Sequence, residues 1–337
     1  MARVAAILRA LWQAFRRDQK SFQSIAGNNF FLVTALLLQR AGGFLLLIMG
    51  LVMLFPLSTD PLRKIPASRM VLWPLDRRDR WMLRMVSPWL NPVSWIVVGL
   101  AIWAARGKVT LGLWGLVAVL FAVGFLFSDV RLFSTESLWR LVPNFPGLLN
   151  QLVRKNVREL LSTLDFYCAL VLSLCVLAYR ILGPPLPPEA FLAITVLVVL
   201  ALSSYAQCLF GLDGDGGLGR YRLLPLRGWQ ILAAKDAAFL VVVLPLTLPL
   251  APLPGMAAAL AALAIGHEPS VRAPRDQTRW RFSTGASLTF GLFQAAMMGM
   301  AASGVFFSSP LVLLLCVAVW LGSLWYYGKE IDRVPVE

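Results

Sequence analysis

Residues able to do chemistry are few in this chain, and they are widely spaced. His267 is the only histidine among 337 residues, so the sequence predicts neither a histidine metal cluster nor a histidine-based catalytic triad. It stands beside Glu268 at the end of an apolar segment, where a polar residue at the membrane interface is expected. Asp165 and Asp236 also fall near the ends of apolar segments. Because ion-coupled carriers keep ionisable groups deep in the helix bundle, this placement argues against secondary transport and intramembrane acid–base catalysis.

Two segments of the chain have some features of phosphate-binding loops. Residues 214–219 have the spacing G-x-G-x-x-G. A dinucleotide site needs a buried strand before this motif, whereas an apolar span precedes it here, so a turn is predicted instead. At Gly107-Lys108, Ile102 stands where a phosphate loop needs its first glycine. We therefore expect no catalytic residue, no metal and no cofactor in this chain. If transport here is ATP-driven, ATP and magnesium are bound by a separate polypeptide.

The remaining polar and sulfur groups lie within apolar segments. Gln207 and Gln294 are the polar groups closest to the centre of the predicted spans, and two roles remain open for them. They can join helices through hydrogen bonds, or they can contact a substrate. The cysteines lack metal-site spacing and are predicted to be packing residues; they are Cys168, Cys175, Cys208 and Cys316.

The elements that must position these residues are membrane helices. Hydrophobic residues make up 58% of the chain and charged residues 14%, far from the balance of a soluble domain. Long uncharged runs include 85–105, 190–212 and 282–328, and about 20 apolar residues cross a bilayer as a helix. The fold class predicted is therefore all-α, a polytopic transmembrane helical bundle. The net charge of +14 is divided into short blocks between apolar runs, which the positive-inside rule explains without nucleic acid.

Placing every basic block in the cytoplasm gives a topology. The blocks lie at residues 3–20, 63–84, 154–158, 220–235 and 272–281. Each apolar region between them must then cross an even number of times, which predicts about ten spans with both termini cytoplasmic. The expected location is the plasma membrane, the inner membrane in a bacterium. Residues 29–57 form a hairpin in this topology, and the alternative is one long helix with an odd number of spans.

The predicted organisation has four parts. They are a cytoplasmic amphipathic helix over 1–28, an N-terminal membrane region of about four spans over 29–140, an amphipathic connecting helix over 141–162, and a six-span domain over 163–337. The six spans are predicted at roughly 163–182, 188–210, 231–249, 253–267, 287–306 and 310–328. The connecting helix carries an apolar row opposite Arg154, Lys155 and Arg158, so we expect it to lie along the membrane. Residues 69–75 match 220–226 at four of seven positions, which indicates either an internal repeat or convergent loop composition.

One loop carries a resemblance to a known family. Residues 207–213 read Gln-Cys-Leu-Phe-Gly-Leu-Asp, and they are followed by a spaced set of basic and apolar residues: Gly217, Arg220, Leu224, Pro225, Leu226, Arg227, Ile231, Leu232 and Lys235. This pattern resembles the loop between spans two and three in the membrane subunits of type-two ABC exporters. The resemblance covers residues 144–337, including the order of surface helix, six spans and loop. The sequence departs from the family in its extra N-terminal hydrophobic region and in a glycine-rich loop with Gly228 after Arg227.

The resemblance implies a permease subunit, and not an enzyme, whose loop docks a cytoplasmic ABC ATPase. The implied coupling residues are Arg220, Leu224, Pro225, Leu226, Arg227, Trp229 and Lys235, and a second candidate coupling loop consists of Arg69, Leu72, Pro74, Leu75 and Arg77. Other implied partners are the lipid bilayer and a second permease copy or paralogue, with no nucleic acid. In the alternative interpretation the basic residues only set orientation. Two other function classes stay open, a membrane-embedded lipid-modifying enzyme and an assembly subunit without transport activity.

Overall fold

The computed structural model divides the chain into two compact units, and each is described by itself. The first comprises residues 1–23 and 35–132, and the second comprises residues 24–34 and 133–337. Every regular element in the described ranges is a helix. The structure describes residues 2–17, 28–31, 73, 75–90, 95, 115, 149–182, 185, 187–213, 217–222, 225–277 and 282–333. The predicted hairpin over 29–57 and the remaining N-terminal spans lie almost entirely outside these ranges.

In the first unit, two amphipathic helices are described. Helix α1 spans Ala2–Arg17, and α6 spans Arg77–Val86 with the 3-10 turn η2 (Ser87–Leu90) after it. Leu11 of α1 is buried with Leu75 and with Leu83 of α6. Part of the apolar row of α1 is therefore covered by protein.

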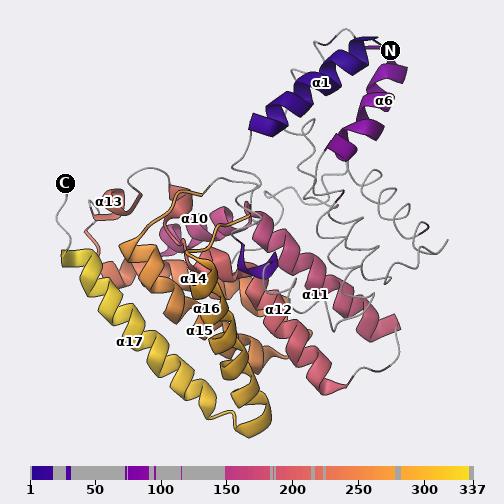
Figure 1. Ribbon diagram of the computed structural model, residues 1–337. Helices are drawn as coiled ribbons and strands as arrows, with labels where there is room; N and C mark the ends of the chain where they lie inside the picture. Colours follow the sequence, from indigo (N-terminus) through magenta and orange to yellow (C-terminus); the bar gives the residue numbers. More distant parts are fainter. Residues whose placement is uncertain are drawn as a thin grey trace. The chain divides into compact units, whose positions relative to one another are not determined.

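The second unit contains six long helices at the positions of the six predicted C-terminal spans (Figure 1). In the described part of the chain, five helices are long and apolar enough to cross a membrane: α11, α12, α14, α16 with its continuation η4, and α17. The bounds are α11 Leu164–Leu182, α12 Pro188–Ala206, α14 Gly228–Thr247, α15 Pro252–Arg272, α16 Leu288–Ser303, η4 Gly304–Ser308 and α17 Val312–Arg333. The connection from α12 to α14 contains the short helices η3 (Gly211–Asp213) and α13 (Gly217–Arg222).

Helix α15 is the central helix of the second unit, although it is not one of the five apolar candidates. It packs against α12, α14, α16 and α17. Its buried positions are mostly small residues, and a Cβ atom on Gly266 would lie 2.2 Å from the Ala206 carbonyl oxygen. Because small residues allow neighbouring helix backbones to approach closely, α15 can be surrounded by protein without large apolar side chains.

The amphipathic connecting helix, α10 (Asn150–Leu160), packs against α14. Val153, Val157 and Leu160 are buried there, so the apolar row contacts protein. An amphipathic row fits protein and lipid equally well. The predicted helix and its exposed Lys155 and Arg158 are present, and its position along the membrane stays a prediction.

The two ends of the second unit differ in charge. The start of α14 meets the end of α17, where the Gly228 amide donates a hydrogen bond to Asp332 at 2.7 Å. Figure 1 shows α10 and α13 near this same end. At the opposite end, Arg180 donates to the Pro249 carbonyl oxygen at 2.6 Å. Among the described basic residues of this unit, Arg180 alone lies at that end; the others are Arg154, Lys155, Arg158, Arg220, Arg222, Arg227, Lys235, Arg272, Arg275, Lys329 and Arg333.

Candidate functional site: the anchored loop between α12 and α14

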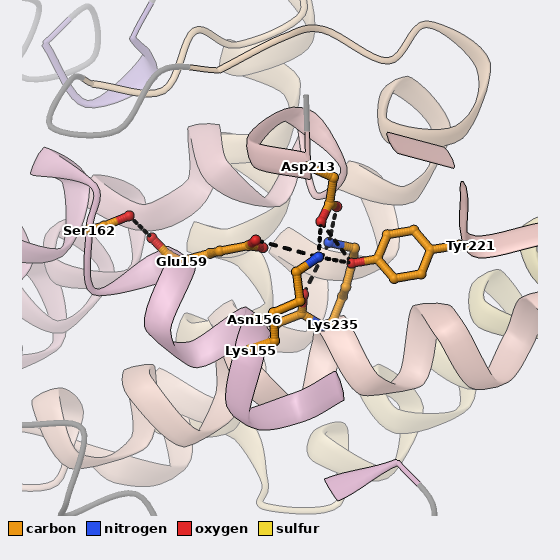
Figure 2. Close-up of polar contacts among 7 residues, drawn as sticks. All are labelled: Lys155, Asn156, Glu159, Ser162, Asp213, Tyr221 and Lys235. Carbon is orange, nitrogen blue, oxygen red and sulfur yellow. Dashed lines mark hydrogen bonds and ion pairs between the residues drawn. The ribbon is translucent and has the colours of Figure 1, made fainter. Parts of the chain in front are cut away.

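The loop between α12 and α14 is held by a buried ion pair. Asp213 ends η3, and Lys235 lies two turns into α14 with its side chain fully buried. The Lys235 ammonium donates to Asp213 Oδ2 at 2.8 Å and to Asn156 Oδ1 of α10 at 3.2 Å (Figure 2). It also lies 4.9 Å from the centre of the Phe210 ring, a favourable cation–π distance. Three residues of the family-like pattern, Phe210, Asp213 and Lys235, therefore meet in space.

A second pair of groups binds the other oxygen of the same carboxylate. Tyr221 of α13 donates its hydroxyl to Asp213 Oδ1 at 2.8 Å. Lys155 of α10 donates to Asp213 Oδ1 as well, and to the Tyr221 hydroxyl at 2.9 Å. Figure 2 shows these side chains converging on Asp213 from different elements. We name the set Lys155, Asn156, Asp213, Tyr221 and Lys235 the Asp213 clamp, because it joins the loop to α10, α13 and α14.

The charges around the clamp are balanced. Burial acts to raise the pKa of Asp213, but the Lys235 charge and the hydrogen bonds from Lys155, Lys235 and Tyr221 outweigh it and hold this pKa below its ordinary value. Burial raises the pKa of Glu159, which lies 3.5 Å from the Lys155 ammonium. Burial, and then the Asp213 charge, also raise the pKa of the Tyr221 hydroxyl. Asp213 is therefore the charged anion of the clamp at neutral pH, and Tyr221 stays a hydrogen-bond donor.

Glycines let the loop and the helix ends pack closely. A Cβ atom on Gly211 would lie 2.4 Å from the Arg275 carbonyl oxygen, and Gly211 itself accepts a hydrogen bond from the Gln277 amide at 2.8 Å. A Cβ atom on Gly228 would lie 2.2 Å from the Gly328 carbonyl oxygen of α17. Gly228 departs from the family-like pattern, and its role here is to let the start of α14 contact the end of α17.

The predicted coupling residues are divided between the surface and the interior. Arg220, Pro225 and Arg227 are exposed, Leu226 is half-buried, and Trp229 is 41% exposed. Leu224 lies outside the described residues. Lys235, one of the implied coupling residues, has its ammonium buried and bound to Asp213.

The second candidate coupling loop is only partly described. Leu75 is buried with Leu11 and Leu83, so it is not available to a partner, whereas Arg77 is exposed at the start of α6. The residues of this loop outside the described ranges are Arg69, Leu72 and Pro74. The repeat proposed between this loop and residues 220–226 stays a prediction.

The glycine motif that resembles a dinucleotide loop has a different setting. Gly217 begins α13 and Gly219 lies within it, while residues 214–216 are outside the described ranges. The element before the motif is the 3-10 turn η3. A dinucleotide site requires a strand at that place. The described half of the motif is therefore helical and not the predicted turn, and the element described before it is not the strand that a dinucleotide site needs.

Buried polar groups that the sequence placed at membrane interfaces lie inside the bundle. Asp165, Asp236 and His267 are all fully buried. Asp165 accepts hydrogen bonds from the Asn28 side chain at 2.8 Å and from the Ser283 amide at 2.9 Å. Alternation of apolar and polar residues along one segment cannot reveal such contacts, because their partners are far away in sequence. Asp165 lies in the first turn of α11, near a span end as predicted, whereas Asp236 lies near the middle of α14 and not near its end.

The two glutamines of the predicted spans contact each other. Gln207 donates to Gln294 Oε1 at 2.6 Å, and Gln294 donates to the Ala262 carbonyl oxygen at 2.7 Å. Gln207 also accepts from the Ala286 amide at 2.6 Å. These bonds join the end of α12 to α15 and α16. Of the two predicted roles, helix joining and substrate contact, this is the first.

Comparison with known proteins finds no relative of this chain. No family model, no curated protein and no solved structure matches the chain. The function must therefore be argued from the loop, its clamp and the helices around it.

Proposed function

We propose that this chain is the membrane-spanning permease subunit of an ATP-driven ABC transporter, acting as an exporter with a separate ATPase. The observation that carries the proposal is the Asp213 clamp. It anchors the loop between α12 and α14 through Phe210, Asp213 and Lys235, which belong to the pattern that resembles the exporter family. A loop that transmits force must be fixed to the helices it moves, and a buried ion pair between loop and helix provides such a fixed point.

The path from the loop into the bundle runs through two adjacent residues of α14. Lys235 binds Asp213 of the loop. Asp236 contacts His267 of α15 at 3.1 Å and accepts a hydrogen bond from Trp320 of α17 at 2.8 Å. Because residues 235 and 236 point to different neighbours, displacement of the loop would act on α14, α15 and α17 together. This connection suits a partner that closes on ATP binding and moves the helices as a group.

The uneven charge of the second unit supports a cytoplasmic loop. Basic residues concentrate at the end that carries α10, α13 and the loop, and the positive-inside rule favours this end in the cytoplasm. The exposed Arg220 and Arg227 would face acidic groups of the ATPase, with Trp229 and Leu226 as apolar contacts. ATP and magnesium would be bound by that partner.

One group of three residues bears on the alternative function, a lipid-modifying enzyme. Ser323, His267 and Asp236 are the residue types of a hydrolase triad, and they are connected by contacts of 2.9 and 3.1 Å. However, the Ser323 hydroxyl donates its hydrogen to the Ala264 carbonyl oxygen at 2.7 Å. A serine nucleophile must instead give that proton to the histidine. The arrangement therefore favours a structural or proton-holding role over nucleophilic catalysis.

Reporter fusions test the proposed topology of ten spans. We expect a fusion at Pro66 to report the cytoplasm, because it lies within a basic block, and a fusion at Pro187 to report the exterior. The measurement is the activity of a paired set of reporters that are active only on one side of the membrane. An exterior signal at Pro66 would contradict the hairpin over 29–57.

A second expectation concerns ATP hydrolysis. The purified chain, freed of other subunits, should release no phosphate from ATP, because its sequence contains no phosphate loop. Phosphate release should appear when the ATPase subunit that co-purifies from native membranes is present. Hydrolysis by the chain alone would overturn the division of labour between permease and ATPase.

A further inference from the structure

The interior of the second unit contains a buried Asp–His pair that is not part of the Asp213 clamp. Asp236 of α14 and His267 of α15 are fully buried, and His267 Nε2 lies 3.1 Å from each oxygen of the Asp236 carboxylate. The indole Nε1 of Trp320 donates to Asp236 Oδ2 at 2.8 Å. On its other side, His267 Nδ1 lies 2.9 Å from the Ser323 hydroxyl oxygen. Three helices, α14, α15 and α17, therefore meet at one imidazole ring.

Donor counting gives the protonation state of this ring. An ionised carboxylate only accepts hydrogen bonds, so Nε2 must carry a hydrogen to bind Asp236. The Ser323 hydroxyl has one hydrogen and lies 2.7 Å from the Ala264 carbonyl oxygen; in the arrangement where it donates to that oxygen, Nδ1 is the donor to Ser323. Both ring nitrogens are then donors, which is the imidazolium cation. Asp236 neutralises it, and neither buried charge is left without a partner.

We propose that the Asp236–His267 pair is a proton-binding site of the bundle, with His267 holding the exchangeable proton. Loss of the Nδ1 proton leaves the imidazole with one donor, and the Ser323 hydroxyl must then turn its hydrogen from the Ala264 carbonyl oxygen to Nδ1 to keep the His267 contact. It also leaves a net negative charge in the interior, which is costly when unpaired. Proton occupancy thereby controls which group of α15, the Ala264 carbonyl or the His267 ring, accepts the hydrogen of Ser323 on α17. The proposal does not rest on the permease function.

The other charged groups near the pair are bound to other partners, which leaves Asp236 as the counter-charge of His267. On α17, the Tyr327 ring lies 6.3 Å from the His267 ring, and Glu330 is paired with Arg272 at 2.9 Å. On α15 itself, Glu268 is exposed and also paired with Arg272. Lys235, next to Asp236 on α14, binds Asp213. Tyr205 of α12 interacts electrostatically with Glu159 and Asp213. The helices α16 and η4 contain no titratable residue.

The single histidine makes the test direct. Full-length chain labelled with ¹⁵N-histidine and reconstituted in lipid nanodiscs gives one imidazole spin system, because the sequence has no other histidine. At neutral pH we expect both ring nitrogens to show the chemical shifts of a protonated imidazole. Asp236→Asn should convert the ring to the neutral form by removing the counter-charge. Glu268→Gln, a matched change at an exposed carboxylate beside His267, should leave the imidazolium signal unchanged.

Two results would overturn the proposal. One is a neutral imidazole in the wild-type chain at neutral pH, a measurement that needs no variant and so does not depend on whether Asp236→Asn folds. The other is an imidazolium signal that persists in folded Asp236→Asn. A purely structural hydrogen bond to Asp236 would produce the first of these results. Reporter topology and ATPase binding are independent readouts, so failure here leaves the proposed transport function untouched.

Discussion

Asp213→Asn is expected to destabilise the second unit by about 3–5 kcal/mol, the usual effect of removing one partner from a buried ion pair. The asparagine keeps the shape of the side chain but removes its charge, and Lys235 then stays buried without an anion. A change of this size is a large fraction of the 5–15 kcal/mol that typically separates folded from unfolded protein. The measurement is thermal unfolding in detergent at neutral pH, where the lowered pKa of Asp213 keeps the wild-type carboxylate charged.

Two controls separate the clamp from general effects of lost charge. Glu268→Gln removes the charge of an exposed pair with Arg272, and it should leave the unfolding temperature almost unchanged. Asp213→Asn combined with Lys235→Met removes both partners of the buried pair, so it should recover much of the lost stability. If Asp213→Asn unfolds at the same temperature as Glu268→Gln, the clamp does not hold the loop.

Much of the second unit was predictable from apolar segment length alone. Six helices begin and end within a few residues of the predicted spans, because about 20 apolar residues are needed to cross a bilayer and Pro-rich or basic segments separate them. Helix α10 was predictable from its apolar row. The element against which that row packs was not predictable, because a row of Val and Leu fits lipid and α14 equally well.

The contacts of charged residues were the part that sequence reasoning missed. Spacing identified Asp213 and Lys235 as members of one pattern, yet it could not show that they bind each other across 22 positions. Asp236 and His267 are 31 positions apart, and Asn28 and Asp165 are 137 positions apart. Such pairs are created by helix packing. A signal that was present and underused is that an ionisable residue within an apolar segment generally needs a partner.

The geometry also changes which residues can contact an ATPase. With Lys235 occupied by Asp213, the exposed charges of the described loop are Arg220 and Arg227, and the large exposed apolar side chain is Trp229. Interfaces of this kind depend on a few apolar or aromatic anchors within a charged rim. Leu226, half-buried beside them, is the second candidate anchor. The clamp then provides rigidity, and these neighbouring residues provide the contact.

Leu226→Asp should abolish retention of the ATPase in a detergent pull-down. It would place an unpaired charge in the dry centre of the contact, which costs on the order of several kcal/mol. A loss of that size weakens binding by roughly 100-fold or more. Insertion and folding should survive, because Leu226 is only half-buried and lies outside the helices of the bundle. Size-exclusion profiles of the purified variant would verify this before the pull-down.

The matched control is the same substitution at the other end of the bundle. Leu182 ends α11 and is 85% exposed, so Leu182→Asp adds the same charge far from the loop and should retain the ATPase. Trp229→Ala should fall between the two, since it removes an apolar anchor without adding a charge. If Leu226→Asp binds the ATPase as well as Leu182→Asp does, the loop is not the docking element. The Asp213 clamp would then be a structural feature of the bundle, because its buried bonds hold the loop whether or not a partner contacts it.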